Sequence, residues 1–203
     1  MISATCSNPV STIQQVLLLT AVVDIMDKNY NPHPCRILLD SASQANLISR
    51  SMVNRLGLKQ IPSNIIVAGE NSTKTHSSSS CLVQIRSRYT SFCTNIDCLV
   101  TDRVTADLPT TSLNISTWKL PIGVRLADST FYARGRIDML VGAQLFLKIL
   151  LPGEFSIDDN LPILKETQFG WVVGGAYKNA CQDSIVHSHS VTLEELSRSI
   201  QRF

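Results

Sequence analysis

An acidic residue ends an apolar run early in this chain. The run is Ile37-Leu38-Leu39, the acid is Asp40, and the small polar residues Ser41-Ala42-Ser43-Gln44 follow it. A strand that ends on a carboxylate and turns at once is one way to present an acidic site to a cleft. Asp-Ser-Ala-Ser is also an ordinary turn sequence, because Asp and Ser side chains hydrogen-bond to nearby backbone amides. The stretch alone therefore leaves a site and a plain turn both open.

A second apolar run lies far along the chain. It is Ile137-Asp138-Met139-Leu140-Val141, and Gly142 closes it. The apolar pattern of Leu145–Leu151 that follows predicts a short amphipathic helix. The two runs together, rather than either one alone, favour a site.

Strands and a helix must position these residues. We predict a first strand over Val16–Ile25 and a hairpin partner over Cys35–Leu39. Ser49 is predicted to cap a helix over Ser51–Leu56 that stops at Gly57. The other predicted elements are a return strand at Asn46–Ile48, a half-buried antiparallel pair at Cys81–Thr90 and Phe92–Val100, and a final strand at Phe169–Gly175.

The order of these features resembles the retropepsin-like aspartic proteases, and it is most similar to the protease of BEL/Pao-type retrotransposon polyproteins. That family has apolar-apolar-Asp-Thr/Ser-Gly early and apolar-apolar-Gly late, the second run threading beside the first and leading into a short helix. Other matching segments are Ser43–Ile48, Arg55–Leu58 and Phe169–Gly175, and the resemblance covers roughly residues 15 to 175. It implies a mostly β protein: a retropepsin-like closed antiparallel β-barrel or sheet with one or two short helices and the dimeric acid-protease fold.

The resemblance also implies an activity: an aspartic endopeptidase that processes a retrotransposon polyprotein, with no metal and no cofactor. Such an enzyme holds two carboxylates against one water. Like charges so close cannot both be ionised, so the pair shares a proton. The chain has one Asp-Ser-Ala motif, and Asp138 does not occupy a matching position. We therefore expect a homodimer in which each subunit supplies Asp40.

Further roles follow from the same resemblance. Ser41 would brace the two active-site loops, and the backbone of Ala42 would donate to the carboxylate. A flap would approach an extended peptide substrate, although the same stretch also fits a surface loop without function. The flap residues are Ala68, Gly69 and Glu70, and the serine run Ser77–Ser80 nearby argues against tight packing. The second loop comprises Leu140, Val141 and Gly142, while Leu39, Ile66, Leu140 and Val141 are either pocket walls or plain core.

One residue departs from the family pattern. Ala42 stands where the family usually has Gly, which allows a tight backbone approach and a positive φ at no steric cost. A methyl group is tolerated there if φ is negative, and otherwise it crowds the carboxylates. The alternative to an active protease is thus a catalytically silent retropepsin-fold binding or scaffold module.

Composition and length bound the remaining possibilities. The 203 residues carry a formal net charge of +2, with no basic stripe that would indicate direct nucleic-acid binding. We expect a flexible leader at 1–14, the protease domain at 15–175 and a polar linker with a short amphipathic helix at 176–203. An insertion at 101–136 either covers the substrate cleft or packs on the sheet. No secretory signal or bilayer-spanning stretch is visible, so we expect a cytoplasmic location, in retroelement particles, without membrane contact.

Other chemistries are disfavoured by what the chain lacks. The six cysteines form no Cys-x-x-Cys pair, which disfavours zinc and favours reduced, mostly buried thiols. No Gly-x-Ser-x-Gly elbow is present, and the four histidines lie in predicted loops or the tail, which disfavours a serine or cysteine hydrolase. An all-β domain unrelated to proteases, with both motifs accidental, is the remaining alternative.

Overall fold

The structure is a computed structural model that describes residues 15–68 and 74–177. These residues form mostly β-strand, with two short helices. The predicted leader and the predicted C-terminal helix lie outside the described residues. The helices are α1 (Arg50–Leu56) and α2 (Ala143–Ile149), and the strands are β1 (Gln15–Leu17), β2 (Thr20–Met26), β3 (Pro32–Leu39), β4 (Asn46–Ser49), β5 (Ile61–Ala68), β6 (Lys74–Arg86), β7 (Cys93–Thr101), β8 (Met139–Val141), β9 (Leu150–Ser156), β10 (Ile163–Thr167) and β11 (Gly170–Tyr177).

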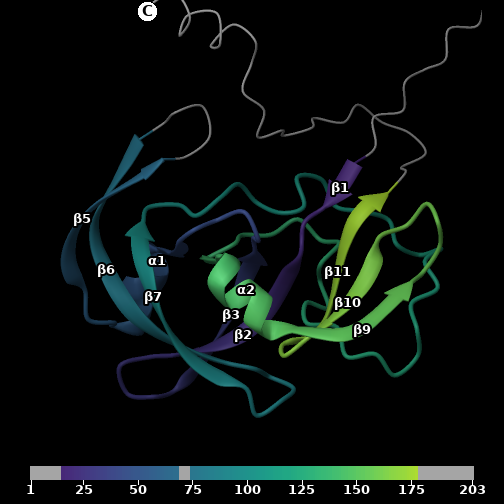
Figure 1. Cartoon of the computed structure of the whole chain (residues 1–203), viewed down its shortest axis with the longest axis horizontal. Helices are drawn as coiled ribbons and strands as arrows, with labels where there is room; N and C mark the ends of the chain where they lie inside the picture. The colour runs from purple at the N-terminus through teal and green to yellow at the C-terminus, as the bar shows by residue number, and fades with distance from the viewer. Residues whose placement is uncertain (1–14, 69–73, 178–203) are drawn as a thin grey trace, which may run out of the picture.

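Six of these strands close into a barrel (Figure 1). Their order is β2-β3-β8-β4-β7-β6, and pairing between β6 and β2 closes the ring, while β5 extends from β6 as a hairpin. The prediction of a mostly β closed barrel is confirmed. The barrel is not wholly antiparallel, however, because β3 pairs with β8, and β4 with β7, in parallel.

Helix α1 is capped as the sequence predicts, although it begins one residue earlier, at Arg50. The Ser49 hydroxyl accepts a hydrogen bond from the backbone N–H of Met52, which satisfies a donor at the start of the helix. Gly57 ends the helix in the left-handed conformation, with φ 63°. Met52 and Leu56 lie on the buried face and join the barrel core.

The single strand predicted over Val16–Ile25 is wrong, because the chain changes sheets within it. β1 ends at Leu17 and pairs with β11, whereas β2 begins at Thr20 and pairs with β3. Leu19 lies at the change, and its side chain fills the space where Gly174 would carry a Cβ. A continuous apolar run cannot show such a change, since hydrophobicity indicates burial but not which sheet a strand joins.

The serine run Ser77–Ser80 belongs to β6, and the prediction of loose packing there is wrong. The side chains of Ser77 and Ser79 are buried. The Ser77 hydroxyl lies 3.1 Å from the carbonyl oxygen of Val100, and the Ser79 hydroxyl donates to the side-chain oxygen of Gln60 at 2.9 Å. Small polar residues can therefore line the barrel wall, because their hydroxyls find partners there.

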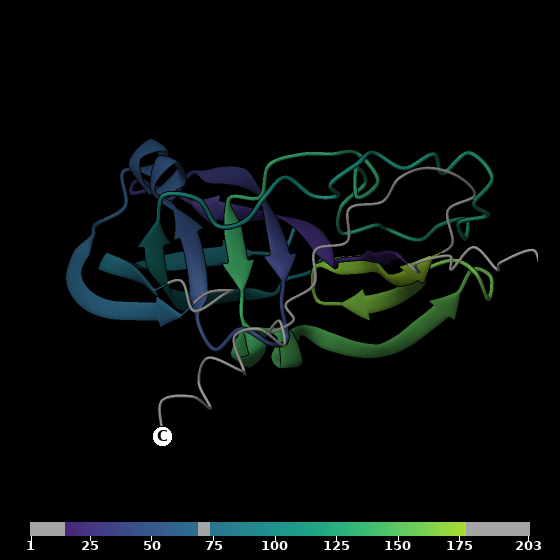
Figure 2. The ribbon, with the colours of Figure 1, turned by 90° about the horizontal axis from the view of Figure 1, so that it is seen from above.

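A second lobe lies beside the barrel (Figure 2). It consists of a four-stranded antiparallel sheet in the order β1-β11-β10-β9, with the irregular residues of the insertion packed on one face. Its core joins Leu17 and Val173 from the sheet to Phe131 from the insertion, and the ring of Trp118 stacks on Phe131 at 5.9 Å between centroids. Of the two arrangements predicted for the insertion, packing on a sheet is present. β11 also runs to Tyr177, past the predicted domain end at residue 175.

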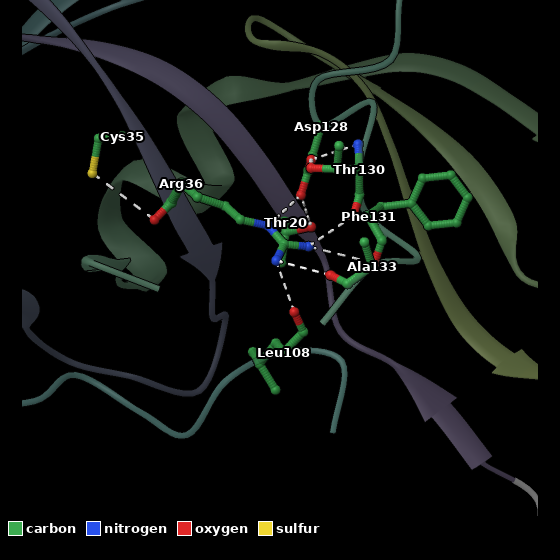
Figure 3. Close-up of polar contacts among 8 residues, drawn as sticks. All are labelled: Thr20, Cys35, Arg36, Leu108, Asp128, Thr130, Phe131 and Ala133. Atoms are coloured by element: carbon green, nitrogen blue, oxygen red, sulfur yellow. Dashed lines mark hydrogen bonds and ion pairs between the residues drawn. The ribbon is translucent and has the colours of Figure 1, made fainter. Parts of the chain in front are cut away.

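One arginine of the barrel holds the insertion in place (Figure 3). Nε of Arg36 donates to Oδ2 of Asp128 at 2.6 Å, and the two terminal nitrogens donate to backbone carbonyls of the insertion. The hydroxyl of Thr20 donates to the same Asp128 oxygen at 2.7 Å. Because the Asp128 side chain is only 1% exposed, these donors offset the cost of burying its charge. The four carbonyls belong to Leu108, Thr130, Phe131 and Ala133.

Candidate active site

Asp40 stands directly after the last residue of β3. Its backbone N–H donates to the carbonyl of Val141 at 2.9 Å, so the β3–β8 ladder holds the residue in place. Its carboxylate accepts a hydrogen bond from the backbone N–H of Ala42 at 2.8 Å. Asp40 is half-buried, whereas Ser41 and Ala42 are exposed. The turn therefore holds the carboxylate at the surface while the strand behind it is anchored in the barrel.

Strand β8 is inserted between β3 and β4, the two strands that flank the Asp40 turn. It pairs with β3 in parallel, Leu39 opposite Val141, and with β4 in antiparallel fashion, Leu47 opposite Leu140. The predicted second run thus lies beside the first and leads into α2. The predicted helix is shorter than its apolar pattern, because Leu150 and Leu151 belong to β9.

Gly142 passes close to the backbone of the Asp40 turn. A Cβ at this position would lie 2.7 Å from the carbonyl oxygen of Ser43 and 2.8 Å from that of Ala45, so only glycine fits without a shift of the backbone. The backbone N–H of Gly142 donates to Oδ1 of Asn46 at 2.9 Å. The backbone N–H of Ala143 donates to the carbonyl oxygen of Ser43 at 2.8 Å. Two hydrogen bonds and the close approach of Gly142 to two carbonyl oxygens therefore join the two predicted loops.

Asn46 is a site residue that sequence reasoning missed. Its side-chain oxygen accepts from Gly142, and its side-chain nitrogen donates to the carbonyl of Asp97 at 3.1 Å, so it links the Gly142 loop to β7. A usable signal was present in the sequence: a polar amide begins an apolar strand, where an apolar residue would otherwise be expected.

Ala42 adopts no strained conformation. Among the described residues, Tyr30 is the one non-glycine residue with a positive φ. The glycine usual in the resembling family is therefore not needed here for its conformational freedom, because the Ala42 backbone lies in a region open to any residue. Ala42 is exposed, and its backbone N–H is the group that contacts the carboxylate.

The other acidic residues of interest are paired elsewhere. Asp138 accepts from the Ser49 hydroxyl at 2.8 Å and from Nε of Arg136 at 2.9 Å. Asp138 precedes Met139, which is opposite Ile37 at one end of the short strand β8. Asp40 follows Leu39, which is opposite Val141 at the other end of β8. Asp138 therefore lies away from Asp40. The remaining two candidates in the irregular segment, Asp102 and Asp107, pair with arginines.

The flap prediction falls partly outside the described residues. Ala68 ends β5, and its partner across the hairpin is Lys74 at the start of β6. Gly69 and Glu70 lie outside the described residues. The bracing role of Ser41 stays a prediction.

The residues considered as pocket walls are core residues where the structure describes them. Leu39 and Val141 are 5% and 0% exposed and point into the barrel core. Leu140 is 7% exposed but belongs to a separate cluster outside the barrel, together with Leu38 and Leu108 of the insertion. The side chain of Ile66 lies outside the described part of the chain.

Three free thiols lie inside the barrel. Cys35, Cys81 and Cys98 are buried, and Cys93 is exposed. Burial raises the pKa of Cys81 to about 11 and raises the pKa values of Cys35 and Cys98 well above the ordinary value. Because the thiolate is the reactive form, these three groups are protonated and inert at neutral pH.

Comparison with known proteins adds no identification. No protein-family model matches this chain, and no curated protein sequence matches it significantly. Neither of the two helices in the described ranges is long and apolar enough to cross a membrane.

Proposed function

We propose that this chain is the subunit of a retropepsin-like aspartic endopeptidase of the BEL/Pao retrotransposon type. Asp40 is its catalytic residue, and its substrates are polyprotein segments. The observation that carries the proposal is the insertion of β8 between the strands that flank the Asp40 turn, with Gly142 packed against that turn. This arrangement fixes one carboxylate at the end of a buried strand and leaves it accessible to a water and a peptide.

The proposed reaction needs a second carboxylate, and Asp40 of a second copy supplies it. Asp128 and Asp138 are bound to arginines within the chain, which leaves them unsuited to face Asp40. A twofold axis beside the turn brings the same residue from each subunit together. One carboxylate is then ionised and takes a proton from the water, while the protonated one polarises the scissile carbonyl.

The substrate is an extended peptide from a polyprotein. It lies between the Asp40 turns and the β5–β6 hairpin, which acts as the flap. An extended chain forms backbone hydrogen bonds at each position, and alternate side chains reach the same wall of the site. No metal or cofactor takes part, since the water is activated by carboxylates alone.

The first test is cleavage by the wild type and by Asp40→Asn, with natural flanking sequence and with a peptide library, at about pH 5, where a carboxylate pair shares one proton. We expect a loss of about 10²–10⁴-fold, the range for removing a general acid or base. Asp159→Asn, an exposed acid on another part of the surface, is the matched control and should cleave normally. Equal cleavage by the wild type and Asp40→Asn would overturn the proposal.

The dimer is tested by mixing subunits. If both Asp40 carboxylates are required, an equal mixture of wild type and Asp40→Asn re-associates to about one quarter active dimers for a twofold assembly. The activity of the mixture should then be about one quarter of that of the same amount of wild type. An activity near one half would mean that each subunit acts alone, which contradicts the shared site. Over a dilution series, the dimer seen by sedimentation and the activity seen in a cleavage assay should disappear together.

The second candidate is a silent binding module, and the observation that favours it is that Ala42, with a methyl group where glycine is usual in the resembling family, contacts the carboxylate through its backbone. Ala42→Gly separates the two. If the wild type is folded and inert but Ala42→Gly cleaves, then the methyl group silences the site. If both cleave at similar rates, then the departure from the family pattern has no catalytic consequence.

A further inference from the structure

The four-stranded sheet of the second lobe has two faces, and the insertion packs on one of them (Figure 2). Leu17, Leu164 and Val173 point toward the insertion and belong to the apolar cluster that it forms with the sheet. Because strand side chains alternate, the neighbouring residues in β1, β10 and β11 point to the opposite side. That side is the outer face of the sheet.

Apolar side chains form a continuous patch on the outer face. Val16 lies opposite Ala176, and two residues back along β11 Gly174 lies opposite Ile163. The side chain of Leu19 covers Gly174, where a Cβ would otherwise stand. Leu19 and Ala176 are half-buried, and Val16 and Ile163 are exposed. The outer patch therefore consists of Val16, Leu19, Ile163 and Ala176.

The barrel covers one end of the outer face. Val172 points to this face two residues before the glycine, and it is buried in the barrel core. At the other end, among the residues that the structure describes, Val16 and Ile163 keep 63% and 38% of their surface exposed. Isolated apolar side chains on a surface are normal, whereas apolar side chains that adjoin across neighbouring strands favour a docking surface.

The sequence supplies an apolar stripe for this patch beyond the end of β11. Residues 192–203 match a short amphipathic helix, with a capping box at its start. The apolar residues that fall on one side of this predicted helix are Leu193, Leu196, Ile200 and Phe203. A helix of about 12 residues is marginal in water by itself, so its apolar side needs a surface to pack on.

The covalent tether favours this segment over a second copy of the chain. β11 ends at Tyr177, the residue after Ala176 of the outer patch, and residues 178–191 separate that end from the stripe. A chain of this length spans up to about 45 Å, so residues 192–203 can reach the patch. A tethered partner acts at an effective concentration on the order of 1 mM, which a separate copy does not reach in dilute solution.

We propose that residues 192–203 dock as a helix on the outer patch of the same chain, with the apolar stripe packed against Val16 and Ile163. The insertion covers one face of the second-lobe sheet, and the docked helix covers the other. The sheet then lies between two layers, which buries apolar surface on both of its faces. This inference is independent of the proposed protease activity.

The test is amide hydrogen exchange of the full-length chain, followed by mass spectrometry. Two variants disrupt the contact from opposite sides: Leu196→Glu in the segment and Val16→Glu in the patch. Gln201→Glu, on the polar side of the predicted helix, and Ile122→Glu, a fully exposed position of the insertion, are the matched controls. Exchange in β3 shows whether the barrel is intact. If Val16→Glu alters it, Val16→Thr replaces that variant, because threonine keeps the branched shape that suits a strand.

We expect residues 192–203 of the wild type to exchange at least about 10-fold more slowly than a synthetic peptide of the same sequence. Leu196→Glu and Val16→Glu should each raise the exchange rate of this segment about 10-fold, since each removes one apolar contact, and the two controls should not. A segment that exchanges like the free peptide overturns the inference, and so does protection that survives the change at Val16. Protection that disappears on dilution, together with a dimer seen by sedimentation, would assign the patch to a second copy and also overturn it.

Discussion

The barrel and the second lobe are stabilised in different ways. In the barrel, six strands share continuous backbone pairing, and the Asp40 turn is held by backbone contacts with Val141, Gly142 and Ala143. In the second lobe, one isolated bridge joins Leu108 to Gly135 within the insertion, and another joins Leu126 to Trp171 of β11. The Arg36 contacts tie the insertion to the barrel. The carboxylate is thus positioned by backbone geometry, whereas the position of the insertion depends largely on side-chain contacts.

The largest effect is expected where the barrel allows no adjustment. Gly142→Ala places a Cβ against two backbone carbonyls, so we expect more than about 4 kcal/mol of destabilisation or a failure to fold. The measurement is urea unfolding followed by circular dichroism. Gly123→Ala is the matched control: its φ of 84° costs about 1–2 kcal/mol, but nothing lies within 4 Å of the added atom. Equal losses in both variants would show that the close contact is unimportant.

Arg36→Met is expected to weaken the second lobe more than the barrel. Removing one partner of a buried ion pair costs about 3–5 kcal/mol, because the other charge stays buried. Both tryptophans of the chain, Trp118 and Trp171, belong to the second lobe. Their fluorescence should therefore change at lower urea than circular dichroism does. Coincident transitions would mean that the two lobes unfold as one unit.

Thr20→Val removes a single donor from the same cluster. The hydroxyl of Thr20 is buried and donates to Asp128 at 2.7 Å, and a hydrogen bond to a charged group contributes about 1.5–3 kcal/mol. Valine keeps the shape of the side chain, so the loss is confined to the hydrogen bond. Unfolding in urea measures the loss of free energy. The double variant Thr20→Val/Arg36→Met should lose less than the sum of the two single losses, since both changes act on one carboxylate.

The smallest effect is expected at the β2–β3 turn and depends on pH. Backbone donation from Asn31, with further donors including His33, holds the pKa of Asp27 far below its ordinary value of 3.8. The ionised group therefore stabilises the fold fully above about that ordinary value, and the stabilisation is lost as the pH falls toward the folded pKa. Asp27→Asn should lower the melting temperature at pH 7, with a difference that shrinks near pH 3. An equal difference at pH 7 and at pH 3 would contradict this cause.

Local patterns were enough to predict that the two apolar runs lie side by side, but not what surrounds them. The apolar run before Asp40 and the glycine after Val141 are short signals, and their backbone consequences follow directly. The change of sheet at Leu19 could not be predicted, because both neighbouring strands are apolar. The burial of Ser77 could not be predicted either, since it depends on a carbonyl of β7 that is distant in sequence. The path of the insertion depends on Arg36, which looks like an ordinary surface cation in the sequence.

The pairing of β1 with β11 has a consequence for how this fold can be rewired. Gln15 and Tyr177 are direct partners across two antiparallel strands, so their Cα atoms lie about 5 Å apart. A short linker could join them, and new ends could be opened at the exposed turn after Lys28. Such a circular permutant would keep every strand pair of the barrel. It would also let two copies be fused in tandem through a site remote from Asp40, giving a single-chain pair in which one carboxylate can be changed independently of the other.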